Sequence, residues 1–211
     1  MELPVLLRHF GAIFGTLILS ASQQADAGIG RTPGFASVSH DGEAEYTIPI
    51  ALPPGTNGMT PVLSLEYRHR SRGGLLGIGW SVGGLSQISR CAATIAQDGF
   101  VWRPNMTFTD RFCLDGQRLA NVNSLNYGAA PAEYRTEVES YARIRSIAAA
   151  TNGPDYFVVE AADGRIYEYG ATADSRVDGR DSTTAVGART WALNRIRDRS
   201  GNVIDYSYFE E

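Results

Sequence analysis

The chain has 211 residues, enough for one domain or for one domain and part of a second. Hydrophobic residues make up 43% and charged residues 20%, which is typical of a globular protein and excludes a chain that is disordered throughout. The net charge of −4 gives no indication of a nucleic-acid partner. Every basic residue is Arg, so mechanisms that need a Lys nucleophile or a P-loop Lys are excluded.

Residues 1–27 have the features of an export signal. Arg8-His9 precedes the apolar run 10–19, and Ala25-Asp26-Ala27 has the A-x-A pattern of a cleavage site. A buried N-terminal helix is the alternative, but polar residues follow the apolar run closely and the rest of the chain looks β. The run is also too short to span a bilayer. We expect a mature chain that begins near Gly28, is periplasmic or secreted, and has no membrane span.

The rest of the chain has the texture of a β protein. Short runs rich in Val, Ile, Tyr and Thr are separated by turn signals such as Asp-Gly and Asn-Gly, at a spacing of roughly ten residues. This predicts an all-β fold, an antiparallel sandwich or barrel-like layer of short strands. We expect strands over residues 43–50, 61–67, 85–96, 106–114, 141–147, 156–161, 165–169, 191–198 and 203–209.

Three segments have a more particular pattern. Gly73–Gly84 holds six glycines among apolar residues, which predicts a close-packed turn region and not a flexible linker. Residues 129–140 could include a helix, although Pro131 limits it. Tyr167 and Tyr169, like Tyr206 and Tyr208, follow a turn and share one face of a strand, which suggests hairpins with a common aromatic row. Two such pairs are too few to establish a repeat.

Gly79-Trp80-Ser81-Val82-Gly83 matches the G-x-S-x-G nucleophile elbow of α/β-hydrolases. The elbow needs a strand before Ser81 and a helix after it, whereas a turn entering another strand is expected here. The histidines, His9, His40 and His69, all precede Ser81, so the hydrolase order supplies no general base. We therefore expect these glycines to let the backbone pass close to Trp80, and no catalytic residue is predicted.

Charged clusters and a sequon offer other candidate sites. Asp41, Glu43 and Glu45 alternate along an expected strand, but no Ca²⁺-loop spacing accompanies them, so a solvated strand face is favoured over a metal site. Arg68–Arg72 is a small basic cluster that could contact an anion or a partner, and a solvated turn is again favoured. Asn105-Met106-Thr107 is a formal glycosylation sequon that chance easily explains. No metal or other cofactor is predicted.

Cys91 and Cys113 are the only cysteines. In an exported chain they could form a disulfide, but both lie beside apolar residues and could equally be two buried free thiols. Their spacing, without a nearby histidine pair, makes a poor zinc site.

A longer pattern resembles a known family. Its first part runs from Tyr46 to Tyr67 around Pro53-Pro54-Gly55-Thr56-Asn57-Gly58-Met59-Thr60-Pro61. The glycine–tryptophan block 74–88 follows, and then come Arg90-Cys91, Gln97-Asp98-Gly99 and Asp110–Leu119. Together these segments resemble the N-terminal domain of the SpvB and toxin-complex B family. Residues 198–208 resemble the lead-in to Rhs/YD-repeat sequence.

The resemblance implies a scaffold. In that family this region precedes segments that build a hollow β shell around a toxic C-terminal cargo, so it implies a non-catalytic shell segment whose partners are other segments or subunits of the assembly. It also implies a division into an SpvB-type β domain, residues 28–160, and the start of an Rhs/YD-like hairpin region, residues 161–211. The alternative is a stand-alone secreted β-sandwich that binds protein or carbohydrate, which an exposed patch of several Tyr or Trp residues would favour.

Overall fold

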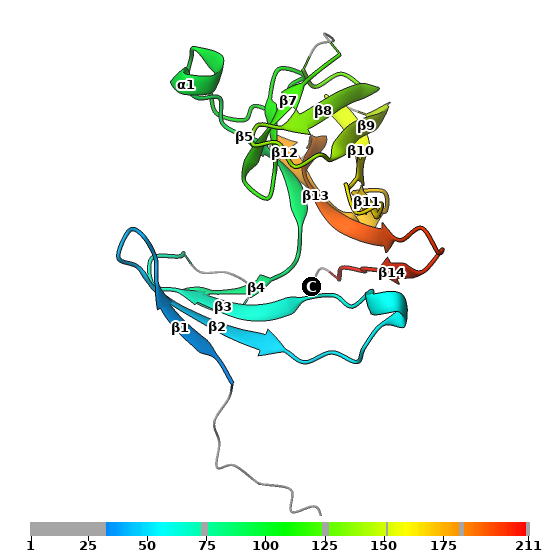
Figure 1. The fold of residues 1–211 in the computed structure, drawn as a ribbon. Coiled ribbons are helices and arrows are strands. Elements are labelled where there is room, and N and C mark those ends of the chain that lie inside the picture. The colour runs from blue at the N-terminus through cyan, green and yellow to red at the C-terminus, as the bar shows by residue number, and fades with distance from the viewer. Residues whose placement is uncertain (1–32, 73–75, 124–126, 151, 182–183, 210–211) are drawn as a thin grey trace, which may run out of the picture. The chain divides into compact units, whose positions relative to one another are not determined.

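The computed structural model describes residues 33–72, 76–123, 127–150, 152–181 and 184–209 (Figure 1). The expected signal segment, residues 1–27, lies outside this part of the chain. No helix among the described residues is long and apolar enough to cross a membrane.

The described chain is almost entirely antiparallel β structure, so the predicted all-β class is confirmed. The strands are β1 (Phe35–Val38), β2 (Ala44–Ile50), β3 (Leu63–Arg68), β4 (Trp80–Gly83), β5 (Gln87–Cys91), β6 (Arg111–Leu114), β7 (Gln117–Asn121), β8 (Ala132–Thr136), β9 (Arg143–Ala150), β10 (Gly153–Glu160), β11 (Ile166–Tyr169), β12 (Arg176–Asp181), β13 (Thr184–Arg197) and β14 (Val203–Asp205). One short helix, α1 (Ile95–Asp98), and two 3₁₀ turns, η1 (Thr56–Gly58) and η2 (Ala173–Ser175), interrupt them.

The first four strands form a sheet in the order β1-β2-β3-β4. Alternating residues predicted β2 and β3 correctly, and the two strands pair from Glu45 opposite Arg68 to Ile50 opposite Leu63. Part of the glycine block, expected to be a turn, instead supplies β4, which pairs with β3. Gly83 allows this close approach, because a Cβ there would lie 2.4 Å from the Ser64 hydroxyl.

The other strands build a closed barrel, so the predicted barrel-like layer is confirmed. Eight strands follow one another as β11-β10-β9-β8-β7-β6-β5-β13, and pairing between β11 and β13 closes the ring. Closure leaves no unpaired edge along that ring. The long strand β13 pairs with β5 through Thr190–Ala192 and also carries β12 and β14 (Figure 1).

Aromatic side chains fill the barrel. Phe112 meets Tyr134, Phe157 and Trp191 edge to face, with ring centroids 5.3–6.0 Å apart. Edge-to-face contacts of this kind add about 0.5–1.5 kcal/mol each to the stability gained from burial. The Trp191 indole also donates to the Asp155 carbonyl over 2.9 Å, so its buried N–H is satisfied.

A buried arginine lies against this aromatic core. The Arg90 guanidinium, whose side chain is fully buried, donates to the carbonyls of Ala188, Thr107 and Asn152 at 2.7–2.8 Å and to the Asp110 carboxylate at 3.0 Å. Burial lowers the pKa of Arg90, while the Asp110 charge and hydrogen bond oppose that shift. The guanidinium therefore ties two loops, which contain Thr107 and Asn152, and strand β13 to β5.

Asp110 and Gly153 complete this arrangement. The Asp110 carboxylate accepts from the backbone amides of Asn105 and Thr107, which fixes the loop before β6. Gly153 leaves room for the guanidinium, because a Cβ at that position would lie 2.5 Å from Arg90 Nη2. The Arg90 guanidinium thus has a hydrogen-bond acceptor in Asp110 and packs closely against Gly153.

The helix considered for residues 129–140 was wrong, because β8 occupies Ala132–Thr136. Ala132, Tyr134 and Thr136 are buried while the residues between them are half-buried, which is the alternation of a strand. Pro131 precedes the strand and blocks a helix there.

Two strands are shorter than predicted at the ends that adjoin the loop between them. The strand expected to reach Ala96 ends at Cys91, because the Thr94 side chain accepts from the Gln97 amide and caps α1. The strand expected from Met106 begins only at Arg111, because Met106 has a left-handed φ of 55° and the following loop is held by Asp110.

At the C-terminal end, the expected strand 203–209 is shorter than predicted, because β14 ends at Asp205. Strands β1, β7 and β12 and the first half of β13 were not predicted. The expected domain boundary after residue 160 falls between β10 and β11, which pair directly and belong to the same barrel.

We predict that Arg90→Met lowers the free energy of unfolding by about 3–5 kcal/mol, because it strands a buried carboxylate and three buried carbonyls. Unfolding in guanidinium chloride measures this change in the free energy of unfolding. Arg195→Met is the matched control, since Arg195 forms an exposed ion pair with Asp205 and should cost at most about 1 kcal/mol. Equal losses in the two variants would contradict the structural role of Arg90.

Candidate interaction surface

The chain leaves the barrel between β5 and β6 and returns through an exposed loop, residues 92–110. Its first part is α1, which ends at Gly99, where a φ of 76° provides the left-handed C-cap. A single antiparallel bridge joins Ala93 to Trp102. Large apolar side chains project from the loop into solvent at five positions, Ile95, Phe100, Val101, Trp102 and Phe108.

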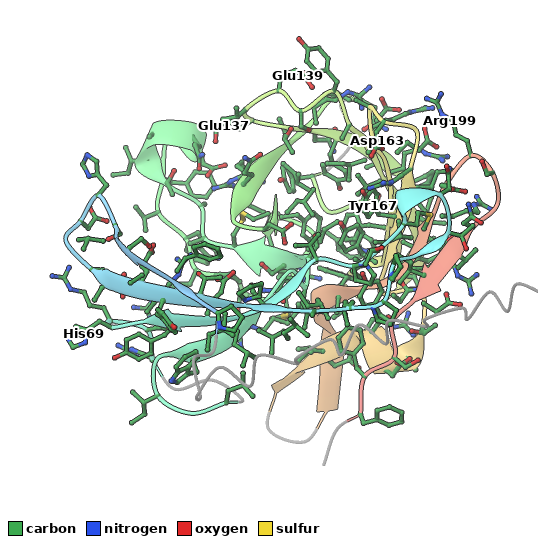
Figure 2. The ribbon with its side chains drawn as sticks, turned by 60° about the horizontal axis from the view of Figure 1, so that its bottom comes forward. His69, Glu137, Glu139, Asp163, Tyr167 and Arg199 are labelled. Atoms are coloured by element: carbon green, nitrogen blue, oxygen red, sulfur yellow. A yellow bond between two sulfur atoms is a disulfide. The ribbon has the colours of Figure 1, made fainter. Side chains whose placement is uncertain are left out.

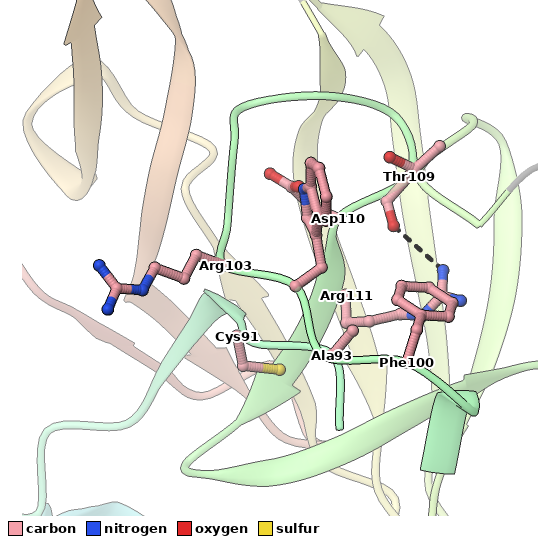
Figure 3. Close-up of a pocket in the computed structure, with 8 residues that line it drawn as sticks. Cys91, Ala93, Phe100, Arg103, Thr109, Asp110 and Arg111 are labelled. Carbon is pink, nitrogen blue, oxygen red and sulfur yellow. Dashed lines mark hydrogen bonds between the residues drawn. The ribbon is translucent and has the colours of Figure 1, made fainter. Parts of the chain in front are cut away.

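Two hollows lie along this loop. The first, about 330 Å³, is lined by Cys91, Ala93, Phe100, Trp102, Arg103, Thr109, Asp110 and Arg111 (Figure 3). The second, about 430 Å³ and more open, is formed by residues 101–105. Trp102 and Arg103 line both hollows, so the two hollows lie beside the same segment of the loop.

Ion pairs connect the loop to strands β6 and β7 of the barrel. Asp98 accepts from Arg111 at 2.6 Å and from Arg118 at 3.0 Å. Burial by itself would raise the pKa of Asp98, but the hydrogen bonds from Arg111 and the Thr94 amide, with both arginine charges, lower it overall. A lowered pKa means that Asp98 stabilises the fold at neutral pH and loses this contribution only as pH falls through its folded pKa.

Arg111 also connects the loop to the core. Its guanidinium lies 4.6 Å from the centroid of the Tyr127 ring and 5.8 Å from that of Phe100. The Tyr127 hydroxyl in turn accepts from the Phe112 amide and donates to the Leu119 carbonyl. The exposed aromatic loop is therefore continuous with the packed interior of the barrel.

Cys91 and Cys113 lie on the paired strands β5 and β6, with their Cα atoms 5.9 Å apart, and the structure joins them by a disulfide. Cys91 lines the first hollow, and Cys113 lines a third hollow of about 380 Å³ together with Arg118 and Glu137. Formation of the bond in the exported protein stays a prediction.

Ser81 is placed in the middle of β4, opposite Glu66 of β3, and the strand continues through Gly83. This is a flat strand pair and not the sharp strand-to-helix turn of a nucleophile elbow. His69, labelled in Figure 2, lies just beyond β3, where its backbone amide donates to the Ala44 carbonyl. Within the described residues no hydrogen bond connects Ser81 to a histidine.

The acidic and basic clusters of the first sheet lie beside each other. Glu43 accepts from the Arg70 amide, and Glu45 lies 3.8 Å from the Arg68 guanidinium. The third member, Asp41, is exposed beside His40. No group of three His, Cys, Asp or Glu side chains in the described segments is arranged to hold a metal ion. The solvated-face interpretation of both clusters fits this arrangement.

Members of both tyrosine pairs lie against the barrel core, and a common aromatic row stays a prediction. Tyr169 is buried in the barrel, and Tyr167 and Tyr206 pack against the same core. The Tyr208 hydroxyl donates to the Leu193 carbonyl of β13 at 2.7 Å. The sequon residue Asn105 lies on the exposed loop beside the second hollow.

The fold and this surface define an antiparallel β-barrel module with an exposed aromatic loop. A family model described as SpvB, Salmonella virulence plasmid 65kDa B protein, matches residues 38–211. The chain therefore belongs to the SpvB family.

Individual relatives agree. The mono(ADP-ribosyl)transferase SpvB of Salmonella typhimurium strain 14028s and that of Salmonella dublin are each 26% identical to this chain, over 81% of it and 30% of the relative. The chain thus spans less than a third of the length of these relatives.

Among solved structures, the N-terminal domain of the effector SpvB from Salmonella typhimurium strain LT2 is similar with a TM-score of 0.60 and 24% identity, over 78% of this chain and 54% of that one. A crystal structure of TcdB2-TccC3-TEV is similar with a TM-score of 0.68 and 20% identity, over 89% of this chain and 9% of that one. At these identities the likeness shows the shared fold.

We predict that the purified, unreduced protein contains no titratable thiol after denaturation. Reduction should lower the free energy of unfolding by about 3 kcal/mol, because the bond closes a loop between cysteines 22 positions apart. Denaturation with and without dithiothreitol measures this. The Cys91→Ala/Cys113→Ala variant should not respond to the reductant, and two free thiols in the unreduced protein would contradict the disulfide.

We also predict that a fluorophosphonate probe does not label Ser81. A hydroxyl on a flat strand without a neighbouring histidine is not activated for attack. Intact-mass spectrometry compares the wild-type protein with Ser81→Ala, and a probe adduct present in the first but absent in the second would establish a nucleophile that the geometry does not show.

Proposed function

We propose that this chain is a non-catalytic structural segment of an SpvB-type toxin and helps to build the β shell that encapsulates or presents a toxic cargo. The observation that carries the proposal is the family match over residues 38–211, which coincides with the sheet and the complete barrel. The similarity to the N-terminal domain of SpvB supports a position away from the transferase activity for which the longer relatives are named.

The physical character of the barrel supports the same role. A shell wall needs paired strands, tight turns and a dry core, and it needs no convergent set of titratable groups. Here the buried polar side chains of Arg90 and Asp110 hold loop backbone in place through hydrogen bonds. We infer that the partners are other segments or subunits of an Rhs or toxin-complex assembly, with residues 161–211 leading into YD-type hairpins.

Export is a further part of the proposal. We infer that residues 1–27 direct the chain out of the cytoplasm and are removed near Gly28, on the strength of the apolar run and the A-x-A pattern. An oxidising destination also fits the pairing of Cys91 with Cys113.

A second candidate function is a stand-alone secreted binding module for protein or carbohydrate. The exposed aromatic loop favours it, because single exposed apolar residues are common whereas a cluster of them marks an interaction site. The two candidates differ in what the chain is attached to and not in its fold.

Reading the DNA beyond the codon for Glu211 is the first test of the shell proposal. We expect an in-frame continuation, or an adjacent frame, that encodes YD repeats and a C-terminal cargo. A stop codon followed by unrelated genes would contradict the shell role and favour the binding module.

Protease protection then tests the shell directly. In the purified assembly we expect the cargo to resist trypsin, and Arg90→Met to make it sensitive by loosening the barrel, while the surface control Arg195→Met leaves it protected. Immunoblotting of the cargo against time measures this. A cargo that is equally sensitive in all three proteins would contradict encapsulation.

A further inference from the structure

Residues 100–103 run from a bend at Phe100 through the bridge residue Trp102, and the segment has one paired edge. Ala93 and Trp102 exchange both backbone hydrogen bonds, at 2.9 Å and 3.3 Å. In an antiparallel pair of this kind, the N–H and C=O groups of the flanking residues, Val101 and Arg103, point to the opposite edge. Within the described residues these groups have no backbone partner, so the segment presents a free strand edge.

The side chains beside that edge are apolar and exposed. Phe100, Val101 and Trp102 are 48%, 66% and 56% exposed, although the barrel below them is tightly packed. They border the two hollows already described, which together could receive alternate side chains of a neighbouring strand. Main-chain pairing combined with side-chain pockets is how proteins add an extended peptide to a sheet edge.

The charge on the edge itself is that of Arg103, while the nearby Glu137 carboxylate accepts from Gln97. No carboxylate of the described residues lies within ion-pair distance of Arg103, whose side chain points away from Phe100 (Figure 3). Asp98 is shared between Arg111 and Arg118, so one carboxylate serves two guanidinium groups. Asp110 is committed to the buried Arg90. A partner strand that carries carboxylates would complement the charge of Arg103.

We propose that residues 100–103 bind an extended peptide segment of a partner protein in which acidic and apolar side chains alternate, and that this segment pairs as an added β-strand. Its backbone bonds to Val101 and Arg103, its apolar side chains enter the hollows beside Trp102, and its carboxylates face Arg103. This inference goes beyond the shell role and does not depend on it, because the binding edge is complete within the described chain.

Fluorescence anisotropy with defined peptides tests the proposal on the full chain. The probes are seven-residue, end-blocked peptides in which Glu alternates with Val, Leu or Tyr. We expect saturable binding of at least one of them. Replacing Glu by Lys, or methylating the backbone nitrogens that face the edge, should each weaken binding at least about tenfold, because each removes charge pairing or strand hydrogen bonds.

Protein variants complete the test. Arg103→Glu should weaken binding at least about tenfold, whereas Arg199→Glu, a matched exposed arginine on the β13–β14 turn, should leave it unchanged. Circular dichroism and thermal unfolding of both variants should match the wild-type protein, since Arg103 forms no ion pair among the described residues.

Several outcomes would overturn the proposal. One is the absence of saturable binding by all three acidic peptides. Another is binding that is unaffected by backbone methylation or by Arg103→Glu. Self-association of the chain that Arg103→Glu abolishes, without any peptide binding, would assign the edge to a second copy instead. Failure of cargo protection in the shell experiment leaves these results intact, so the two proposals fail separately.

Discussion

The buried guanidinium of Arg90 is the interaction on which the rest of the structure depends. It donates to the carbonyls of Thr107, Asn152 and Ala188 and to the carboxylate of Asp110. These acceptors lie on the loop before β6, on the β9–β10 turn and on strand β13, which are far apart in sequence. A single buried charge is costly unless every donor finds a partner. Here the guanidinium makes four hydrogen bonds that draw two loops and strand β13 to the same point, and so the charge specifies where those segments lie.

The contacts around Arg90 and Asp110 also fix the exposed loop between β5 and β6. Asp110 accepts from the amides of Asn105 and Thr107 at one end of the loop, while Thr94 and Asp98 fix α1 at the other. Apolar side chains on a mobile loop would tend to collapse onto the barrel. Here the backbone is fixed on both sides, and the aromatic side chains remain exposed.

Much of the fold could be predicted, because it depends on local pattern. Alternation predicted β2 and β3, and Asp-Gly turns predicted the hairpin at β11. Prediction failed where tertiary partners override the pattern, as in β8, where burial of Tyr134 against Phe112 outweighs the helix-like composition. The sequence places Arg90 in an expected strand, but its four acceptors become neighbours only when the barrel closes.

The exposed edge at residues 100–103 could not be predicted for the same reason. An apolar run such as Phe100-Val101-Trp102 indicates a buried strand, and only the bridge to Ala93 shows which edge is paired and which is free. A free edge on a flexible loop would lose much of its binding energy to ordering. Because ion pairs and the Asp110 amide bonds already hold this edge, an incoming strand would not have to order it. The same interactions that secure the barrel thus make a surface suited to binding.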